Sequence, residues 1–564
     1  MDDNKRLIVA LALSCGIFFA WNGLASYMGW LDSPKESKTV RQASGNASKP
    51  SPEADAPAAM DADPSSRLEL PREAAPVKGR LIRVETPLYT AVFQENGGVL
   101  DSFVLKKYRE SLEPDSPQLN LISPAAAAAA PLGLLIDGLP TWSAAAWTLE
   151  GQDLALAPGQ EGTLAFVGEM GGVRMERRLH FSADGYLIRE KLLLTSPVER
   201  KIKLAFTFAA STMPSEETTS IFSDLRYLLL GGEKPLPEPS LYNPTRVAWL
   251  ENKTYDDEQA GDTLTSGMLI QGNVTWMGVL NNYFLGAASL ADGAASAKGS
   301  MRDGVFHVLV GRTGVDIAAG QTLEEECIYF IGPKDTEQLR GAPNELSSAL
   351  NYGFFSIIAR PLVSLLQFFY GYAHNYGLAI IMLTILVKLI FWPLSQKSYK
   401  SMQQMKKLQP MMAKIREKHA GDKEAMNKEV MQLYKTYKVN PAGGCLPILV
   451  QIPVFFGLYQ ALLNATELRH AAFISHLPFT DTLWLADLSV RDPLFITPLI
   501  MGSTMFLQQK ITPASGDPTQ TKMMLFMPPI FTLLCFNFPA GLVLYWLVNN
   551  VISIFQQWLQ LRKV

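Results

Sequence analysis

Residues 396–440 read QKSYKSMQQMKKLQPMMAKIREKHAGDKEAMNKEVMQLYKTYKVN, and they set the topology of the whole chain. The segment holds 11 Lys and Arg side chains, from Lys397 to Lys438, against four acids. Two helical stretches, about Ser398 to Lys418 and Asp422 to Tyr437, meet near Gly421. The pattern predicts a basic helical hairpin in the cytoplasm, because short loops rich in Lys and Arg stay on the inner side of a membrane.

The charge of the chain is divided between two unlike parts. Residues 31–345 hold 29 Lys and Arg against 42 Asp and Glu, a balance of −13, whereas residues 346–564 hold 19 against 9, a balance of +10. The first 30 residues are neutral, so the sum is the formal net charge of −3. An apolar fraction of 48% is high for a wholly soluble protein. Together these values indicate a membrane protein with a large acidic domain outside the cytoplasm.

The sequence lacks the motifs of catalysis, metal binding and energy coupling. Only one of the four cysteines, Cys327, lies in the long polar segment, so no disulfide can form within that segment. The six histidines are scattered, and there is no phosphate loop, dinucleotide fingerprint or nucleophile elbow. We therefore expect no enzymatic activity, no cofactor and no metal site.

An apolar run from Leu7 to Trp30 has about the ~20 residues that a membrane-spanning helix needs. We interpret residues 1–30 as an uncleaved transmembrane anchor, with a cleaved signal peptide as the alternative. Residues 31–79 are rich in Pro, Ala, Ser and charge, which predicts a disordered linker.

Residues 80–345 show the period-two alternation of β-strands. Arg174–Phe181 and Tyr186–Thr195 read as strands joined by a turn, and Asn96-Gly97-Gly98 separates two further strand-like runs. Repeated runs with turn signals predict a large antiparallel β-sandwich.

The remaining residues are predicted to form an interfacial amphipathic helix, residues 346–375, and a five-helix core, residues 376–564. The candidate spans of this core are Tyr376–Pro393, Cys445–Leu463, Leu494–Phe506, Met523–Phe538 and Gly541–Leu559. Tyr352–Tyr372 is apolar enough to span, but a second span before the hairpin would place its positive charges outside. We therefore expect that helix to lie in the outer interface, which gives six spans with both termini in the cytoplasm.

The hairpin itself carries a basic surface and a row of methionines. Its candidate functional residues are Lys406, Lys407, Lys414, Arg416, Met411 and Met412. Unbranched methionines suit surfaces that accept varied partners, although they equally suit the core of a hairpin. The positive charges attract anionic lipid, and the alternative is that they serve only to fix the orientation of the chain in the membrane.

Lys388 is a cation inside an otherwise apolar span, with Thr384 one helical turn before it. Such a charge normally faces a bundle interior or a wet cavity, unless it extends to the membrane surface. Polar residues on other spans could line this cavity, and an aromatic pair could flank it. These residues are Gln451, Ser503, Thr504, Thr532, Asn549, Asn550 and Ser553, with the pair Tyr545 and Trp546. Helix packing and an interfacial aromatic belt are the alternatives.

Several motifs extend over nearly the whole chain. They are Asn440–Pro447 (NPAGGCLP), Gln451–Pro453, Phe538–Trp546 (FPAGLVLYW), Leu408–Pro410, Asn351–Gly353, Asn282–Phe284 and Asn96–Gly98. On these residues the chain resembles the YidC/Oxa/Alb family of membrane protein insertases, of the Gram-negative type. The resemblance implies a periplasmic β-supersandwich domain, an interfacial helix, and a five-helix core with a hydrophilic groove open to cytoplasm and lipid. It also aligns Lys388 with a basic groove residue that is more often Arg, and Thr384 and Trp546 with substrate-contact positions.

The resemblance implies a membrane protein insertase and chaperone of the bacterial inner membrane, acting alone or with the Sec translocon. Its expected partners are nascent membrane proteins, anionic lipids and, through the cytoplasmic loops, the ribosome, with no direct contact to nucleic acid. Two other classes stay open on the residues alone: a transporter of anions or other solutes, and a membrane-anchored envelope scaffold. The transporter is disfavoured because the core spans show no inverted repeat.

Overall fold

The computed structural model describes residues 76, 79–113, 115–213, 217–218, 238–239, 243–419, 421–437, 439, 446–480, 482–512 and 518–562. The described residues form two compact units: a β unit, from residue 76 to Glu217 and from Pro239 to Asn351, and a helical unit, which is mainly residues 352–562. The predicted anchor, most of the predicted linker and the motif residues 440–445 lie outside the described residues.

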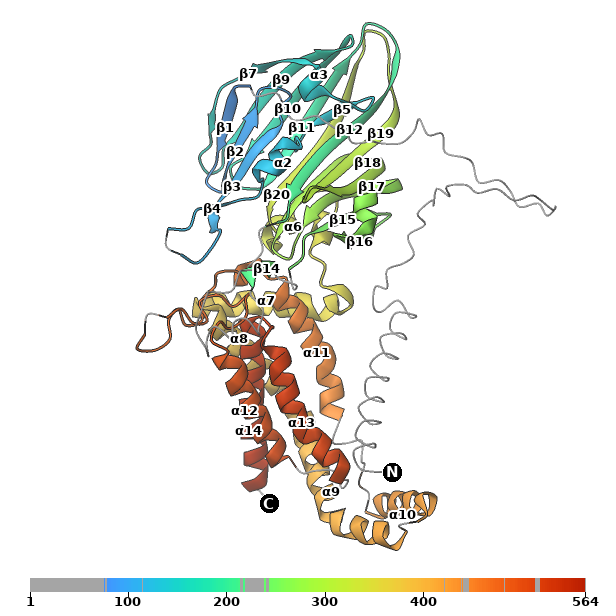
Figure 1. Cartoon of the computed structure of the whole chain (residues 1–564), viewed down its shortest axis with the longest axis vertical. Helices are drawn as coiled ribbons and strands as arrows, with labels where there is room; N and C mark the ends of the chain where they lie inside the picture. The colour runs from blue at the N-terminus through green and yellow to red at the C-terminus, as the bar shows by residue number, and fades with distance from the viewer. Residues whose placement is uncertain are drawn as a thin grey trace, which may run out of the picture. The chain divides into compact units, whose positions relative to one another are not determined.

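The β unit is built from short and long strands that are almost all antiparallel (Figure 1). Its strands are β1 (Leu81–Glu85), β2 (Tyr89–Gln94), β3 (Leu100–Arg109), β4 (Gln118–Asn120), β5 (Leu134–Ile136), β6 (Leu139–Pro140), β7 (Ala146–Glu150), β8 (Leu154–Ala155), β9 (Glu161–Met170), β10 (Val173–Ser182), β11 (Leu187–Thr195), β12 (Arg200–Ser211), β13 (Glu217–Thr218), β14 (Glu238–Pro239), β15 (Arg246–Glu251), β16 (Thr254–Gln259), β17 (Met268–Leu280), β18 (Phe284–Arg302), β19 (Val305–Ile317) and β20 (Thr322–Pro333). Its short helices are α2 (Pro124–Ala128), α3 (Thr141–Ala144), α5 (Asp262–Ser266), α6 (Thr336–Arg340) and η2 (Leu346–Ala349).

The strands form two main sheets that pack face to face. The smaller has the order β4-β3-β2-β1-β8, and the larger runs β6-β5-β12-β19-β18-β20-β11-β10-β9-β7, with β17, β15 and β16 branching from β18. Phe93 on β2 meets Phe181 on β10 edge to face at 5.5 Å, which joins the two layers. The predicted β-sandwich is therefore confirmed at the level of its architecture, and the predicted strand pair 174–195 is the hairpin of β10 and β11.

A fully buried ion pair joins the neighbouring strands β10 and β11, and its arginine also reaches the β2–β3 turn of the smaller sheet. The Arg177 guanidinium donates Nε to Glu190 Oε1 at 2.6 Å and one terminal nitrogen to Oε2 at 2.8 Å. It also donates to the carbonyls of Gly97 and Leu132, and the Tyr329 hydroxyl donates to Glu190. Every charge in this cluster therefore has a partner, which is the condition under which buried charges are tolerated.

Gly98 shows why the Asn96-Gly97-Gly98 turn needs glycine. Its φ of +62° is left-handed, and a Cβ there would lie 2.8 Å from the Phe166 ring. Cys327 is buried and free, as its isolation in the β unit requires, and burial raises the pKa of its thiol well above the usual value.

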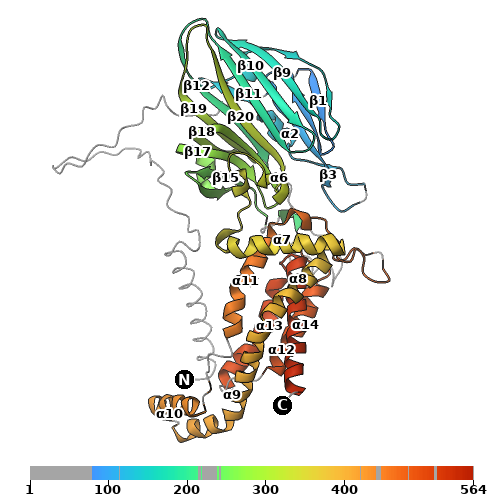
Figure 2. The same cartoon turned by 180° about the vertical axis from the view of Figure 1, so that it is seen from behind.

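The helical unit consists of long helices that pack around an apolar core. They are α7 (Ser356–Ala373), α8 (Tyr376–Ile390), α9 (Trp392–Lys418), α10 (Lys423–Thr436), α11 (Leu446–Leu463), α12 (Ile496–Ile511), α13 (Pro518–Cys535) and α14 (Ala540–Arg562), with the short 3₁₀ turns η3 (Gly353–Phe355) and η5 (Thr466–Leu468). Figures 1 and 2 place α10 and the carboxyl end of α14 at one end of this unit and α7 at the other.

Two predicted boundaries at the start of the hairpin are wrong. The span predicted to reach Pro393 ends at Ile390, and the hairpin helix predicted from Ser398 begins at Trp392. The reason is a bend of 61° between α8 and α9 at Phe391, with Pro393 in the first turn of α9, where a missing N–H costs nothing. Helices α12 and α14 extend past their predicted ends, to Ile511 and Arg562, because their last turns are polar. Helix α11 ends at Leu463 as predicted, whereas α13 begins earlier, at Pro518, and ends earlier, at Cys535.

Helix α7 lies crosswise to α8, α11 and α14 in both views of the fold (Figure 2). Ala359, Leu362, Val363 and Leu366 form its buried face, while Ile357, Arg360 and Ser364 lie on its exposed face. By length and composition, the described helices long and apolar enough to cross a membrane are Gly353–Ala373 and Ala540–Gln560, with the bent pair α8 and α9 as a third. The helix predicted to be interfacial thus also meets the length requirement for a span.

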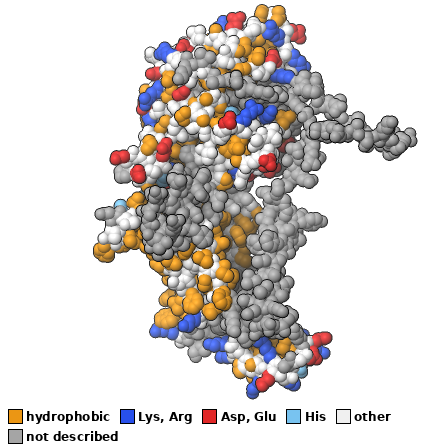
Figure 3. Space-filling model, viewed as in Figure 1, with side chains coloured by type: hydrophobic (Ala, Val, Ile, Leu, Met, Phe, Trp, Pro, Cys, Tyr) orange, Lys and Arg blue, Asp and Glu red, His pale blue; other side chains and the backbone are white. Residues whose placement is uncertain are grey.

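The outer surface of the helical unit is apolar, which is the reverse of a soluble helical bundle. On α8 the exposed residues include Leu378, Met382, Ile385 and Leu389, and on α13 they include Phe526, Met527, Ile530 and Leu533. Figure 3 shows hydrophobic side chains over this surface and Lys and Arg side chains at the end that carries α10. An exposed apolar surface of this kind fits contact with lipid.

We predict that E190Q lowers the free energy of unfolding of the β unit by about 3–5 kcal/mol, because it leaves the buried Arg177 charge uncompensated. The matched control is K191M, which removes the solvent-exposed pair of Lys191 with Glu324 and should cost at most about 1 kcal/mol. Pulse proteolysis of the full chain across a urea series measures both. Equal effects of the two substitutions would contradict a structural role for the buried pair.

Candidate functional site

Lys388 lies inside the helical bundle and is bonded to a neutral group. Its side chain is 5% exposed, and Nζ donates to Ser553 Oγ at 2.7 Å. Ser553 in turn donates to the Asn549 carbonyl at 2.7 Å, one turn earlier on α14. Since a hydroxyl does not cancel a charge, the Lys388 ammonium stays available to attract a negative group.

The inner face of α14 carries a stripe of polar side chains around this contact. Asn550, Ser553, Gln556 and Gln557 are all at least 95% buried, at spacings of three and four residues that place them on one face. Tyr399 on α9 is half-buried beside Ser553 and Gln557, and Gln557 Nε2 donates to Thr512 Oγ1 at 3.0 Å. We call Lys388, Tyr399, Asn550, Ser553, Gln556 and Gln557 the polar interior.

Part of this polar interior has no hydrogen-bond partner. Both side-chain polar atoms of Gln556 and the Oε1 of Gln557 are buried and unpaired among the described residues. A buried polar group without a partner costs about 1–3 kcal/mol. Water or a polar chain that reaches this point of the bundle, as in a hydrophilic groove, would remove this cost.

The structure places the other predicted groove residues in different settings. Thr384 is 1% exposed and donates to the Ile380 carbonyl of its own helix at 2.6 Å, one turn from Lys388. Gln451 on α11 and Asn549 on α14 are half-buried. Of the three, Thr384 and Asn549 lie one turn from Lys388 and Ser553 respectively, so both border the polar interior.

The two aromatic side chains, Tyr545 and Trp546, lie in different environments. Tyr545 is 6% exposed and belongs to the apolar core of the bundle, so packing accounts for its position. Trp546 is half-buried, with its ring 4.2 Å from Phe531 on α13 and 4.5 Å from Phe455 on α11. It therefore lies where three helices meet.

The hairpin of α9 and α10 has a small core and a basic surface. Met412 is buried together with Met405, Leu408 and Val439, whereas Met411 is 41% exposed. Of the two alternatives for these methionines, a buried position applies to Met412 and an exposed one to Met411. Lys406, Lys407 and Lys414 are exposed and Arg416 is half-buried.

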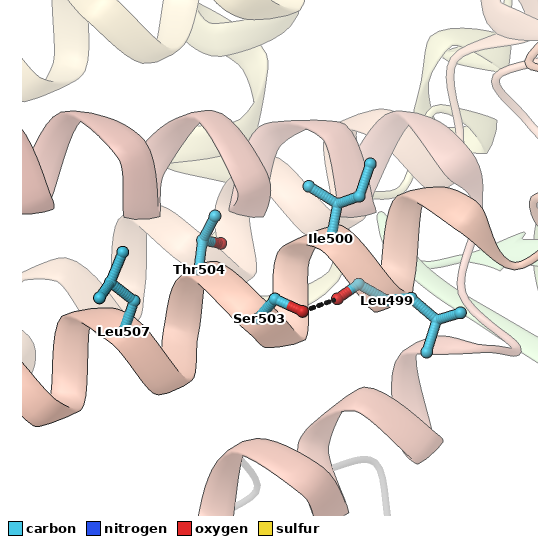
Figure 4. Close-up of a pocket in the computed structure, with 5 residues that line it drawn as sticks. All are labelled: Leu499, Ile500, Ser503, Thr504 and Leu507. Carbon is cyan, nitrogen blue, oxygen red and sulfur yellow. Dashed lines mark hydrogen bonds between the residues drawn. The ribbon is translucent and has the colours of Figure 1, made fainter.

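A shallow depression of about 310 Å³ lies on α12 and is lined by Leu499, Ile500, Ser503, Thr504 and Leu507 (Figure 4). The Ser503 hydroxyl donates to the Leu499 carbonyl at 2.8 Å and Thr504 donates to the Met501 carbonyl at 2.7 Å. Both hydroxyls are thus satisfied within their own helix, and the depression has a mainly apolar lining. The described residues contain no group of His, Cys, Asp and Glu side chains that could hold a metal ion.

Sequence reasoning missed Tyr399, Gln556, Gln557 and Thr512. The signal for the glutamines was present, because Gln556 and Gln557 continue the spacing of Asn549, Asn550 and Ser553 along α14. The sequence pattern assigns Tyr399 to the cytoplasmic hairpin, and the start of α9 at Trp392 brings it near α14.

Apolar outer helices, a buried cation beside unpaired amides and an attached β-sandwich define a polytopic membrane protein with a polar interior. The family model of the 60Kd inner membrane protein matches residues 368–564, and that of the YidC periplasmic domain matches residues 81–365. The membrane protein insertase YidC of Oleidesulfovibrio alaskensis is 52% identical over 568 residues, and that of Lawsonia intracellularis is 47% identical over 568 residues, each covering 100% of both chains. The chain belongs to the YidC family of membrane protein insertases.

The solved structure of an active YidC insertase with its first transmembrane domain resolved is 17% identical, with a TM-score of 0.33, and covers 86% of this chain and 94% of that chain. Family membership confirms three predictions: an insertase and not an enzyme, location in the inner membrane, and a periplasmic β domain. Neither alternative class, the transporter or the scaffold, is supported by these matches.

We predict that Q556L leaves the unfolding midpoint of the purified protein unchanged or higher, because it removes two unpaired buried polar atoms. The same substitution should slow insertion roughly tenfold, the factor that corresponds to about 1.4 kcal/mol, since the polar interior loses hydration. Thermal unfolding in detergent and insertion into proteoliposomes measure the two effects. The control Q432L alters an exposed amide on α10 and should change neither; a fully active Q556L would contradict a wet interior.

Proposed function

We propose that the chain inserts nascent membrane proteins by receiving their polar flanks in the polar interior around Lys388. The observation that carries this proposal is a buried ammonium whose partner is a hydroxyl, near the Gln556 amide, which has no hydrogen-bond partner among the described residues. Such groups replace part of the hydration that a polar segment loses when it enters the membrane.

The positive charge of Lys388 favours substrates with a short acidic flank. An acidic residue that approaches the Lys388–Ser553 contact gains a charge-assisted interaction with the buried Lys388 ammonium. Lysine offers a point charge and lacks the planar fork of arginine, so attraction does not require one bidentate geometry. This tolerance suits a site that accepts many sequences.

The apolar part of the substrate leaves sideways into lipid, and no nucleotide is needed for that step. Leu, Ile, Phe and Val each favour the membrane centre by about 0.3–0.6 kcal/mol, so a span of ~20 such residues moves downhill. The membrane potential adds about 2.3 kcal/mol per charge per 100 mV for an acidic tail that moves outward.

The hairpin of α9 and α10 is proposed to receive the substrate before it enters the groove. Its exposed Lys406, Lys407 and Lys414, with Arg416 and the exposed Met411, offer a basic surface with an adaptable apolar side chain. The same charges attract anionic lipid by ~1 kcal/mol each near the membrane surface.

The proposed topology has six spans, with both termini and the hairpin in the cytoplasm. The positions of α10 and the carboxyl end of α14 at one end of the helical unit support this arrangement. Helix α7 is proposed to lie in the outer interface, since it runs crosswise to the spans and exposes Arg360 and Ser364 among apolar residues. Sec translocon and ribosome contacts are proposed as further partners, the latter through the hairpin and the short loops.

We predict that K388E slows insertion of a substrate with an acidic translocated tail by about tenfold or more, because a like charge in the groove costs several kcal/mol. K388R should retain most of the activity and K388M an intermediate level. The initial rate is measured in reconstituted vesicles that hold a membrane potential.

The matched control is the same substrate with its acidic residues changed to Asn, which K388E should insert with a much smaller defect. Such a difference separates a charge effect from misfolding of the insertase. Unimpaired insertion of the acidic substrate by K388E would exclude the polar interior as the route.

A further inference from the structure

The loop between α11 and α12 ends in a fully exposed aromatic side chain. Phe479 has a relative exposure of 107%, and its neighbours Pro478 and Leu483 are also exposed. An apolar side chain held fully in water has no stabilising contact. The reason for the exposure of Phe479 therefore lies in what surrounds the loop.

Backbone hydrogen bonds join the described residues on the two sides of the tip of this loop. Leu477 N donates to the Thr482 carbonyl at 2.9 Å, and Trp484 N donates to the Ser475 carbonyl at 3.2 Å. Thr480 N and the Thr480 hydroxyl both donate to the Leu477 carbonyl, and Phe479 takes a φ of +68° within that turn. A non-glycine residue in the left-handed region is uncommon, so the backbone hydrogen bonds hold the ring outward against a local preference.

The base of the loop is fastened to α7 and to the first turn of α8. Asn375 Nδ2, at the start of α8, donates to the Phe473 carbonyl at 3.1 Å. Gln367 Nε2 on α7 donates to Glu467 Oε1 at 2.8 Å. The Phe473 side chain also fills the space beside Gly377, where an added Cβ would lie 2.1 Å from its ring. These contacts fix the loop to the first turn of α8, where the exposed apolar face of that helix begins at Leu378.

Helix α7, to which the loop is bonded, also exposes aromatic side chains near its end. Phe368 is 56% exposed and Tyr372 is 71% exposed, both within the last two turns of α7 before Asn375. The polar side chains of Arg360 and Ser364 are exposed on the same helix. This mixture of aromatic and polar exposure is typical of the water–lipid boundary.

The chemistry of the loop favours lipid over an oppositely charged partner. Residues 470–490 contain no Lys or Arg, so the tip has nothing with which to bind an anionic headgroup or an acidic protein surface. The tip therefore offers the apolar side chains of Pro478, Phe479 and Leu483 beside exposed neutral hydroxyls such as those of Thr480 and Thr482, a mixture that suits the water–lipid boundary.

We propose that the loop hairpin around Phe479 is a membrane-interface anchor, with the Phe479 ring inserted among the lipid headgroups and first acyl carbons of the outer leaflet. The side of the membrane rests on the topology proposed above. The depth at which Phe479 inserts does not depend on insertase activity, so an experiment can contradict the anchor without contradicting the proposed function, and the reverse.

The test is spin labelling of F479C in the full chain, with the four native cysteines replaced, reconstituted in phosphatidylcholine vesicles. Accessibility of the label to oxygen and to a water-soluble nickel chelate reports its depth. D303C in the exposed β18–β19 turn is the water reference, and I530C on the exposed face of α13 is the lipid reference.

The proposal predicts an oxygen-to-nickel ratio at residue 479 several-fold above that at residue 303 and below that at residue 530. The ratio should not change when a third of the lipid is anionic. A ratio equal to that at residue 303 would place the tip in water and overturn the proposal. So would exclusion of both reagents, which indicates a protein partner, or insertion that needs anionic lipid.

Discussion

The hydrogen bond from Lys388 Nζ to Ser553 Oγ is the contact around which the helical unit is organised. It joins the last turn of α8 to the middle of α14, and the unpaired amide of Gln556 lies one turn further along α14. In a bilayer core, polar groups must face inward because lipid offers no hydrogen bonds. The apolar exposed faces of α8 and α13 follow from this requirement, since the side chains that would disturb lipid are gathered inside the bundle.

Two buried cations in this chain show how the same physical problem has different solutions. Arg177 in the β unit is neutralised by Glu190 and satisfied by two carbonyls, which makes it a structural link between sheets. Lys388 has a hydroxyl partner, so its charge is solvated but not cancelled. Burying a charge without an opposite charge costs stability, and in membrane proteins such residues usually bind a substrate or an ion. The contrast supports a structural role for the first cation and a functional role for the second.

Much of the fold follows from local sequence signals, and much of the site does not. Period-two alternation and the turn at Asn96-Gly97-Gly98 predict the β-sandwich because each strand has one buried face. A lone cation at residue 388 in an apolar helix is equally visible. The order of strands depends on pairings far apart in the chain. Pro393 marks a helix start next to the bend at Phe391, but the direction of the bend, which brings Tyr399 near α14, depends on how the helices pack. The inward direction of Tyr545 and Met412 likewise depends on which neighbours each helix packs against.

The central claim is that a nascent chain contacts the polar interior during insertion. Photocrosslinkers at positions 553 and 556 should form adducts with a stalled substrate that carries an acidic flank, while a crosslinker at Leu534, on the exposed face of α13, should react with its apolar segment only. The account predicts adducts from positions 553 and 556 that weaken when Lys388 is replaced by Glu. Adducts from position 534 alone, with none from the interior at any length of the stalled chain, would contradict it.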